Sequence, residues 1–152
     1  MYPGTGVLVE EYVDSTTLSM LGPLQPRLHP VQADQLGMRP DSLRQILTKQ
    51  QEEEEQGPRL LYISPTGNNP TGRGSYQVGR KICSPPGTVL PLDRRREVLE
   101  LCSEHDLLVL EDDPHHLLQY GDQADRPPSL LSLDTEGRVL RWVNTHYCDN
   151  GF

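Results

Sequence analysis

Two polar clusters in this sequence carry residue types that could do chemistry together. The first spans residues 65–72 (PTGNNPTG) and the second spans residues 111–116 (EDDPHH), and each follows an apolar run typical of a buried strand. The first would present the Asn69 amide and backbone N–H groups from a sharp turn. The second offers the carboxylate of Asp112 where its strand stops. Because ligands of open α/β sheets bind beyond the carboxyl ends of the strands, both clusters can face one pocket.

The elements that must position these clusters alternate along the chain. Apolar runs predict strands over residues 6–11, 28–31, 59–64, 107–110 and 138–143, of which the second is weak because it contains Pro30. Apolar residues at helical spacing predict helices over residues 15–21, from Pro40 onward, and over residues 94–105 with Asp93 as its cap. Such alternation predicts a parallel sheet with right-handed crossovers.

Composition narrows the class of protein. The 152 residues suggest one domain, and a formal net charge of -8 disfavours nucleic acid or an anionic membrane as a partner. Hydrophobic residues make up 34%, which is low for a self-sufficient α/β core. The three cysteines have neither zinc-site nor disulfide spacing, and we see no targeting segment and no apolar run long enough for a membrane span. We therefore expect a cytoplasmic protein.

The two clusters also resemble a known family. Residues 67–72 (GNNPTG), followed after a helix and a strand by residues 111–114 (EDDP), resemble the class I pyridoxal-phosphate (PLP) aminotransferases. Residues 38–44 and 93–118 resemble in particular the kynurenine/2-aminoadipate aminotransferases. The resemblance runs from about residue 8 to residue 141, which corresponds to only the middle of a longer family chain.

The resemblance implies a fold and its boundaries. We expect a three-layer α/β fold with a mostly parallel sheet, a partial large domain of a fold-type I PLP-dependent transferase, over residues 1–143. Residues 73–87 look like an inserted loop, because their removal would join Gly72 to the expected continuation at residue 88. This insertion is either an extended surface loop or a partner-binding loop. Residues 144–152 look like an unstructured tail.

The resemblance also implies roles for three residues in binding pyridoxal 5'-phosphate. Asp112 would pair with the pyridine nitrogen, and Asn69 would donate to the ring hydroxyl. His115 stands where the family has a tyrosine that bonds the same hydroxyl, and an imidazole can also donate a hydrogen bond. Without the resemblance, Asn69 could simply bond its own turn, and Asp112 could cap a nearby helix.

Other family positions are not matched. The ring-stacking aromatic residue falls near Asp14, where Tyr12 could substitute only if the register slipped by two, and the Schiff-base lysine falls near Tyr147. The chain has two lysines, Lys49 near a helix end and Lys81 in the inserted segment, and neither has the right context. The substrate-binding arginine is expected beyond the end of this chain. We therefore predict no catalytic residue here and an impaired enzyme, because the lysine is both nucleophile and general base.

Three hypotheses follow. The parent reaction would move an amino group from an aromatic or 2-aminoadipate-type amino acid to a 2-oxo acid, in a cytoplasmic or, for the parent family, mitochondrial setting. Alternatively, the chain is a non-enzymatic truncated isoform that forms a homodimer or associates with a full-length aminotransferase through exposed sheet edges. A third hypothesis makes metal ligands of four side chains, although a five-residue span around a proline could hardly point them all one way. They are Asp112, Asp113, His115 and His116.

Overall fold

The computed structural model describes residues 4–13, 15–52, 57–67, 89–116 and 126–143, with the side chain of Glu52 left aside. The main sheet has five strands: β1 (Gly6–Glu10), β2 (Arg27–Val31), β5 (Leu60–Ile63), β6 (Leu108–Asp112) and β7 (Val139–Trp142). A small antiparallel pair is formed by β3 (Ala33–Asp34) and β4 (Gly37–Met38). The helices are α1 (Ser15–Leu21), the 3-10 turn η1 (Gly22–Leu24), α2 (Pro40–Glu52), α3 (Leu92–Glu104) and α4 (Leu130–Leu133).

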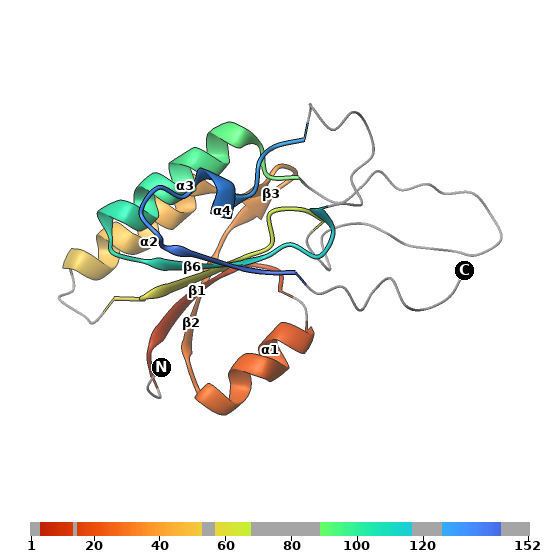
Figure 1. Cartoon of the computed structure of the whole chain (residues 1–152). Coiled ribbons are helices and arrows are strands. Elements are labelled where there is room, and N and C mark those ends of the chain that lie inside the picture. The colour runs from red at the N-terminus through yellow and green to blue at the C-terminus, as the bar shows by residue number, and fades with distance from the viewer. Residues whose placement is uncertain (1–3, 14, 53–56, 68–88, 117–125, 144–152) are drawn as a thin grey trace, which may run out of the picture.

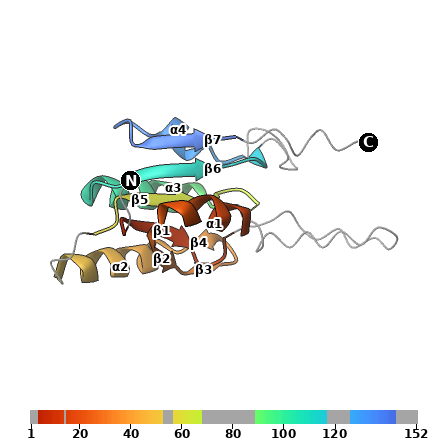
Figure 2. The same cartoon turned by 90° about the horizontal axis from the view of Figure 1, so that it is seen from below.

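The fold has three layers, as expected. The helix α1 covers one face of the sheet, and α2, α3 and α4 cover the other (Figure 1). The strand order is β2-β1-β5-β6-β7, and every pair of neighbours is parallel (Figure 2). Since all five strands point the same way, their carboxyl ends lie along one edge of the sheet, where the two polar clusters begin.

One local expectation is confirmed and another needs correction. The weak strand predicted over residues 28–31 forms as β2, and it accommodates Pro30 because β2 is at the edge of the sheet, where a residue without an N–H group is tolerated. Asp93 does not cap its helix: α3 starts at Leu92 with Pro91 as its N-cap, and Asp93 sits in the first turn. A carboxylate there still interacts favourably with the helix dipole.

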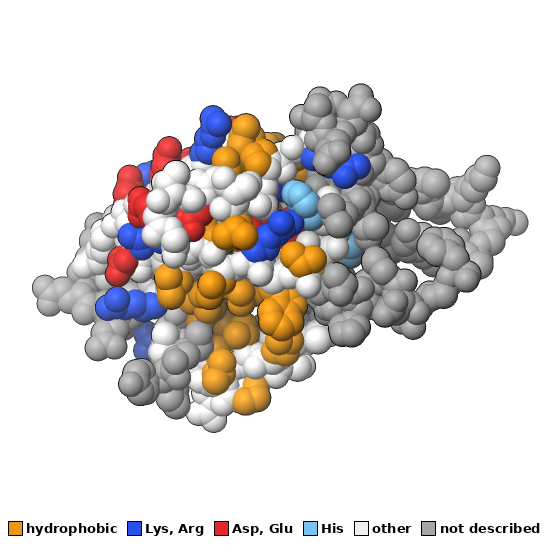
Figure 3. Space-filling model, in the orientation of Figure 1, with side chains coloured by type: hydrophobic (Ala, Val, Ile, Leu, Met, Phe, Trp, Pro, Cys, Tyr) orange, Lys and Arg blue, Asp and Glu red, His pale blue; other side chains and the backbone are white. Residues whose placement is uncertain are grey.

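The core is uneven between the two faces of the sheet. On the α2–α3 side, fifteen buried residues form one cluster that includes Leu8, Leu61 and Val109. On the α1 side, the buried cluster consists of Val7, Val9 and Tyr62. The thinner layer leaves apolar side chains of β6 and β7 at the surface, which appear as a band between α1 and the opposite helix layer (Figure 3).

The chain on either side of the predicted insertion is held together. Thr66 and Val89 form an antiparallel bridge, and the Leu90 N–H donates to the Pro65 carbonyl at 2.8 Å. The predicted insertion at residues 73–87 and the predicted tail at residues 144–152 both lie outside the described residues, so both remain predictions.

Candidate functional site

The first residues of the two polar clusters meet at the carboxyl ends of β5 and β6. Gly67 has a φ of +67°, and a Cβ built on it would lie 3.3 Å from both Cβ and Nδ1 of His115. Only glycine combines this left-handed backbone conformation with so close an approach. The turn after β5 therefore lies directly against the turn after β6.

Asp112 ends β6 and projects toward the α1 side of the sheet. Its Oδ2 accepts a hydrogen bond from the Tyr62 hydroxyl at 2.5 Å, and the Tyr62 hydroxyl lies 3.0 Å from Oγ1 of Thr17 on α1. Burial, together with the neighbouring Asp112 carboxylate, raises the pKa of Tyr62 well above its ordinary value. The phenol therefore stays protonated, and remains a hydrogen-bond donor, at neutral pH.

Glu111 caps α4 at this edge together with the N-cap residue Ser129, whose hydroxyl oxygen accepts from the Ser132 N–H at 3.1 Å. Oε1 of Glu111 accepts from the Leu130 N–H at 2.9 Å, and its Oε2 accepts from the Leu131 N–H at 3.1 Å. These are the first N–H groups of α4, which a carboxylate satisfies well. The capping role considered for Asp112 thus belongs to its neighbour on the opposite face of the sheet.

The four proposed metal ligands do not converge on one point. Asp113 is buried on the opposite side from Asp112, where its Oδ2 lies 3.1 Å from both Arg141 and Nδ1 of His116. Successive strand residues face opposite sides of a sheet, which separates the two carboxylates. Within the described part of the chain, no group of three or more His, Cys, Asp or Glu is placed to hold a metal ion.

A fully buried arginine holds the turn after β5. Arg95 on α3 donates to the carbonyl oxygens of Leu90 at 2.7 Å, Pro128 at 3.1 Å and Pro65 at 3.3 Å. Burial lowers the pKa of Arg95, and the nearby carboxylates of Glu111 and Asp113 oppose that shift. Arg95 therefore fixes the start of the first cluster relative to α3 and to the segment before α4.

At the end of β1, Glu10 brings a further carboxyl group to the same edge. It is 2% exposed, and its Oε2 accepts from the Ser64 N–H at 3.1 Å. Burial raises the pKa of Glu10 to about 8, although the Ser64 hydrogen bond opposes the shift. Glu10 is therefore largely protonated at neutral pH, unlike an ordinary glutamate.

Of the other residues that the resemblance brought into question, Lys49 lies in the described part of the chain. Asn69, Asp14 and Lys81 lie outside the described residues, so the predicted contact of Asn69 stays a prediction. Lys49 lies in the last turn of α2, which leads into the amino end of β5. It is therefore at the end of the sheet opposite to Asp112.

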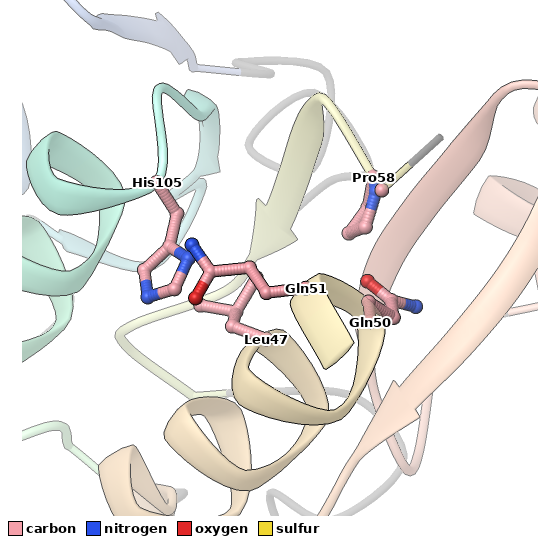
Figure 4. A pocket seen from close by; sticks show the side chains of 6 residues that line it. Leu47, Gln50, Gln51, Pro58 and His105 are labelled. Atoms are coloured by element: carbon pink, nitrogen blue, oxygen red, sulfur yellow. The ribbon is translucent and has the colours of Figure 1, made fainter. Parts of the chain in front are cut away.

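A small surface pocket also lies at that opposite end. It has a volume of about 120 Å³ and is lined by Leu47, Gln50, Gln51, Gly57, Pro58 and His105 (Figure 4). Ligand pockets usually measure about 300–1,000 Å³, so this one is too small for a cofactor-sized molecule. We place no cofactor there.

Sequence reasoning missed Tyr62 and Arg95, although both had a signal. Tyr62 alternates with Leu61 and Ile63, so strand periodicity puts it on the Asp112 side of the sheet. Arg95 precedes Val98 and Cys102 by three and seven residues, which places it on the buried face of α3. The run of three arginines at residues 94–96 hid the difference between them.

Comparison with known proteins gives a consistent set of relatives. The chain is 36% identical over 144 residues to a mitochondrial kynurenine/alpha-aminoadipate aminotransferase of Bos taurus, covering 91% of this chain and 30% of that protein. It is 31% identical over 157 residues to an aromatic amino acid aminotransferase of Schizosaccharomyces pombe, with the same coverage. No protein-family profile matches the chain. The sequence resemblance to kynurenine/aminoadipate and aromatic aminotransferases is thereby confirmed.

Comparison with solved structures also finds aminotransferases. The kynurenine aminotransferase of Pyrococcus horikoshii superposes with a TM-score of 0.78 at 28% identity, over 93% of this chain and 30% of that chain. The aminotransferase Aro8 of Candida albicans gives a TM-score of 0.76 at 28% identity, over 94% of this chain and 30% of that one. The fold is that of part of the large domain of a fold-type I transferase. The chain spans about 30% of the length of these relatives.

Among the helices of the described residues, none is long and apolar enough to cross a membrane.

Proposed function

From the similarity to the aminotransferases, we propose that this chain is an aminotransferase-like unit that binds pyridoxal 5'-phosphate at the carboxyl ends of β5 and β6. The observation that carries the proposal is the placement of Asp112. It stands at the end of an inner strand, on the face opposite to the helix-capping Glu111, and Tyr62 holds one of its oxygens. A carboxylate so placed is what a protonated pyridine nitrogen needs.

The described residues fit non-covalent binding of this cofactor. The carboxylate of Asp112 offers an anion to the ring nitrogen, and the imidazole of His115 offers a hydrogen-bond donor for the ring hydroxyl. The close approach of Gly67 to His115 supports the fit, because a Cβ at Gly67 would lie 3.3 Å from that side chain and would press against it. Asn69 would add an amide donor from the same turn.

Each residue then has a defined task. Asp112 keeps the ring nitrogen protonated, His115 and Asn69 orient the ring through its hydroxyl, and the Gly67 turn brings the two strand ends together. When bound, the cofactor supplies an electron sink for amino-acid chemistry. The parent reaction that we assign to the family transfers an amino group from an aromatic or 2-aminoadipate-type amino acid to a 2-oxo acid.

Catalysis by this chain alone is not part of the proposal. Lys49 stands at the opposite end of the sheet, and the family lysine position falls near Tyr147. Lys81 lies outside the described residues, so we infer from the sequence alone that no lysine reaches the cofactor; such a chain would lack both the covalent anchor and the general base. We propose a binding unit that is impaired as an enzyme and resides in the cytoplasm or in mitochondria, the compartment in the name of the Bos taurus relative.

The test is a binding titration that uses a built-in reporter. Trp142, the one tryptophan of the chain, is the register partner of Asp112 on β7, so both side chains project from the same face at adjacent strands. Pyridoxamine 5'-phosphate is the probe, because it has no aldehyde that could react with Lys49 or Lys81. We expect saturable quenching of Trp142 fluorescence, and at least tenfold weaker binding for Asp112→Asn, which loses a charge-assisted hydrogen bond.

A second candidate function rests on the open edge of the sheet. Within the described residues, β7 pairs with β6 on one side and with no strand on the other. Leu140 and Trp142 on β7 are 65% and 58% exposed, and an edge strand of this kind pairs readily with another chain. The alternative is therefore a non-enzymatic partner of a full-length aminotransferase.

Sedimentation of the chain with a purified full-length kynurenine/2-aminoadipate aminotransferase tests this alternative. We expect association in the micromolar range that Leu140→Lys weakens, because a charge on the edge strand opposes strand pairing. Leu36→Lys, at another exposed leucine, between β3 and β4, is the matched control. Absence of any complex at micromolar concentrations would exclude this role.

A further inference from the structure

We propose that Tyr62 is a positioning residue for Asp112, and that it orients the carboxylate for the ring nitrogen of a bound pyridoxal-type cofactor. This inference rests on the proposed function and adds to it a residue outside the set of Asn69, Asp112 and His115. It starts from three side chains on three elements. They are Thr17 on α1, Tyr62 on β5 and Asp112 on β6.

The direction of the hydrogen bonds follows from the available protons. An ionised carboxylate can only accept, so the single hydroxyl proton of Tyr62 goes to Oδ2 of Asp112, 2.5 Å away. The oxygen of Tyr62 is then left to accept, so Thr17 Oγ1, 3.0 Å away, is the donor in that contact. The two hydrogen bonds therefore run in one direction, from Thr17 to Tyr62 and from Tyr62 to Asp112, and each polarises the next.

The hydrogen bond from Tyr62 occupies one oxygen of the Asp112 carboxylate. A carboxylate offers about four acceptor sites on two oxygens, so a bond at Oδ2 leaves Oδ1 able to accept from a ligand. The terminal side-chain torsion angle of an aspartate otherwise has a broad, roughly two-fold distribution. The Tyr62 bond narrows that range, which lowers the ordering cost of binding.

Tyr62 is itself well held, as a positioning residue must be. Its side chain is 7% exposed and packs in the buried cluster with Val7 and Val9, with Leu60 and Leu110 beside them. Strands on both sides of Tyr62 supply these contacts. The hydroxyl is therefore presented to Asp112 by the rigid part of the sheet.

A purely structural role makes a different prediction. If the chain of bonds served only to tie α1 to the sheet, then Thr17 would matter as much as Tyr62. Thr17→Val removes the bond to α1 but leaves Tyr62 its proton for Asp112. Thr17→Val and Tyr62→Phe therefore separate tethering of the helix from positioning of the carboxylate.

The experiment is a double-mutant cycle on Tyr62→Phe and Asp112→Asn with two readouts. The first is the midpoint of denaturant unfolding without ligand, which reports on the Tyr62–Asp112 pair whether or not a cofactor binds. The second is the dissociation constant of pyridoxamine 5'-phosphate, measured through Trp142. We expect Tyr62→Phe to weaken binding about fivefold to tenfold in the wild-type background and less than twofold in the Asp112→Asn background. Thr17→Val should lower the midpoint yet change binding less than twofold.

Every outcome is decisive. Equal weakening by Tyr62→Phe in both backgrounds would overturn the proposal, because the tyrosine would then not act through Asp112. So would additive changes in the unfolding midpoint, which would mean that the two residues do not interact. If the midpoints are coupled but the wild-type chain binds no pyridoxamine 5'-phosphate, then the positioning role and the proposed function both fail, and the pair is a structural contact.

Discussion

At the carboxyl end of β1, Glu10 keeps a carboxyl group almost entirely out of water. Burial raises the pKa of Glu10 from 4.5 to about 8, so the native state holds a proton that the unfolded chain releases at much lower pH. Between these two values the native state binds more protons than the unfolded state. The contribution of Glu10 to the free energy of unfolding therefore falls as pH rises from about 4.5 to 8, and levels off above that range.

Glu10→Gln should remove this dependence. An amide cannot ionise, and its oxygen can still accept from the Ser64 N–H. We expect the variant to match the wild type below about pH 4.5 and to be more stable at pH 8, by an amount on the order of a few kcal/mol. Denaturant unfolding at several pH values measures the difference.

The neighbouring Glu11→Gln is the matched control, because Glu11 is exposed. Its stability should follow the wild-type curve across the same pH range. If Glu10→Gln and Glu11→Gln gave parallel curves, the account of Glu10 as a buried neutral acid would be wrong.

At the scale of elements, Arg95 connects three segments through the hydrogen bonds of one side chain. Its guanidinium donates to carbonyl oxygens before α3, after β5 and before α4. Replacing it by methionine keeps much of the volume but leaves buried carbonyl groups without these donors. We expect Arg95→Met to lower the free energy of unfolding by about 3–5 kcal/mol, whereas the exposed neighbour Arg96→Met should change it by less than about 0.5 kcal/mol.

Urea unfolding of the two variants measures both effects. A loss at Arg95 no larger than that at Arg96 would show that the three hydrogen bonds do not stabilise the turn. The same comparison bears on the site, because Arg95 holds Pro65 and Thr66, which lead into Gly67.

The sequence predicted most elements because their patterns are local. Apolar runs located β1, β5, β6 and β7, and helical spacing located α2 and α3. The four-residue helix α4 was missed, since Leu130–Leu133 is too short for any periodicity and depends on capping by Glu111. That cap comes from nineteen residues earlier in the chain.

The candidate site residues show the same difference between local patterns and long-range contacts. Asp112 and His115 were predicted as cofactor-binding residues because they stand in a motif, and that role stays a prediction. The close approach of Gly67 to His115 supports the prediction that the two clusters meet. Tyr62 has no motif of its own, and its importance comes from contacts with α1 and β6 that only the packed sheet creates. The contacts of Asn69 are still a prediction.

At the scale of the whole molecule, the sheet is well covered on one face and thinly covered on the other. The α2–α3 side buries fifteen residues in one cluster, whereas Leu108, Leu140 and Trp142 on the α1 side are half exposed or more. The low hydrophobic content of 34% agrees with this imbalance. Since the chain spans about 30% of its relatives, the central question is whether this part of the fold still binds a cofactor.

Titration of the purified chain with pyridoxamine 5'-phosphate, followed through Trp142 fluorescence, answers that question most directly. Inorganic phosphate at the same concentrations is the control for a non-specific anion effect. We predict a saturable isotherm for the pyridoxamine compound, no change with phosphate, and at least tenfold weaker binding by Asp112→Asn. A linear response, or one that is identical for wild type and Asp112→Asn, would contradict the assignment of Asp112 and the strand ends of β5 and β6 as a cofactor site.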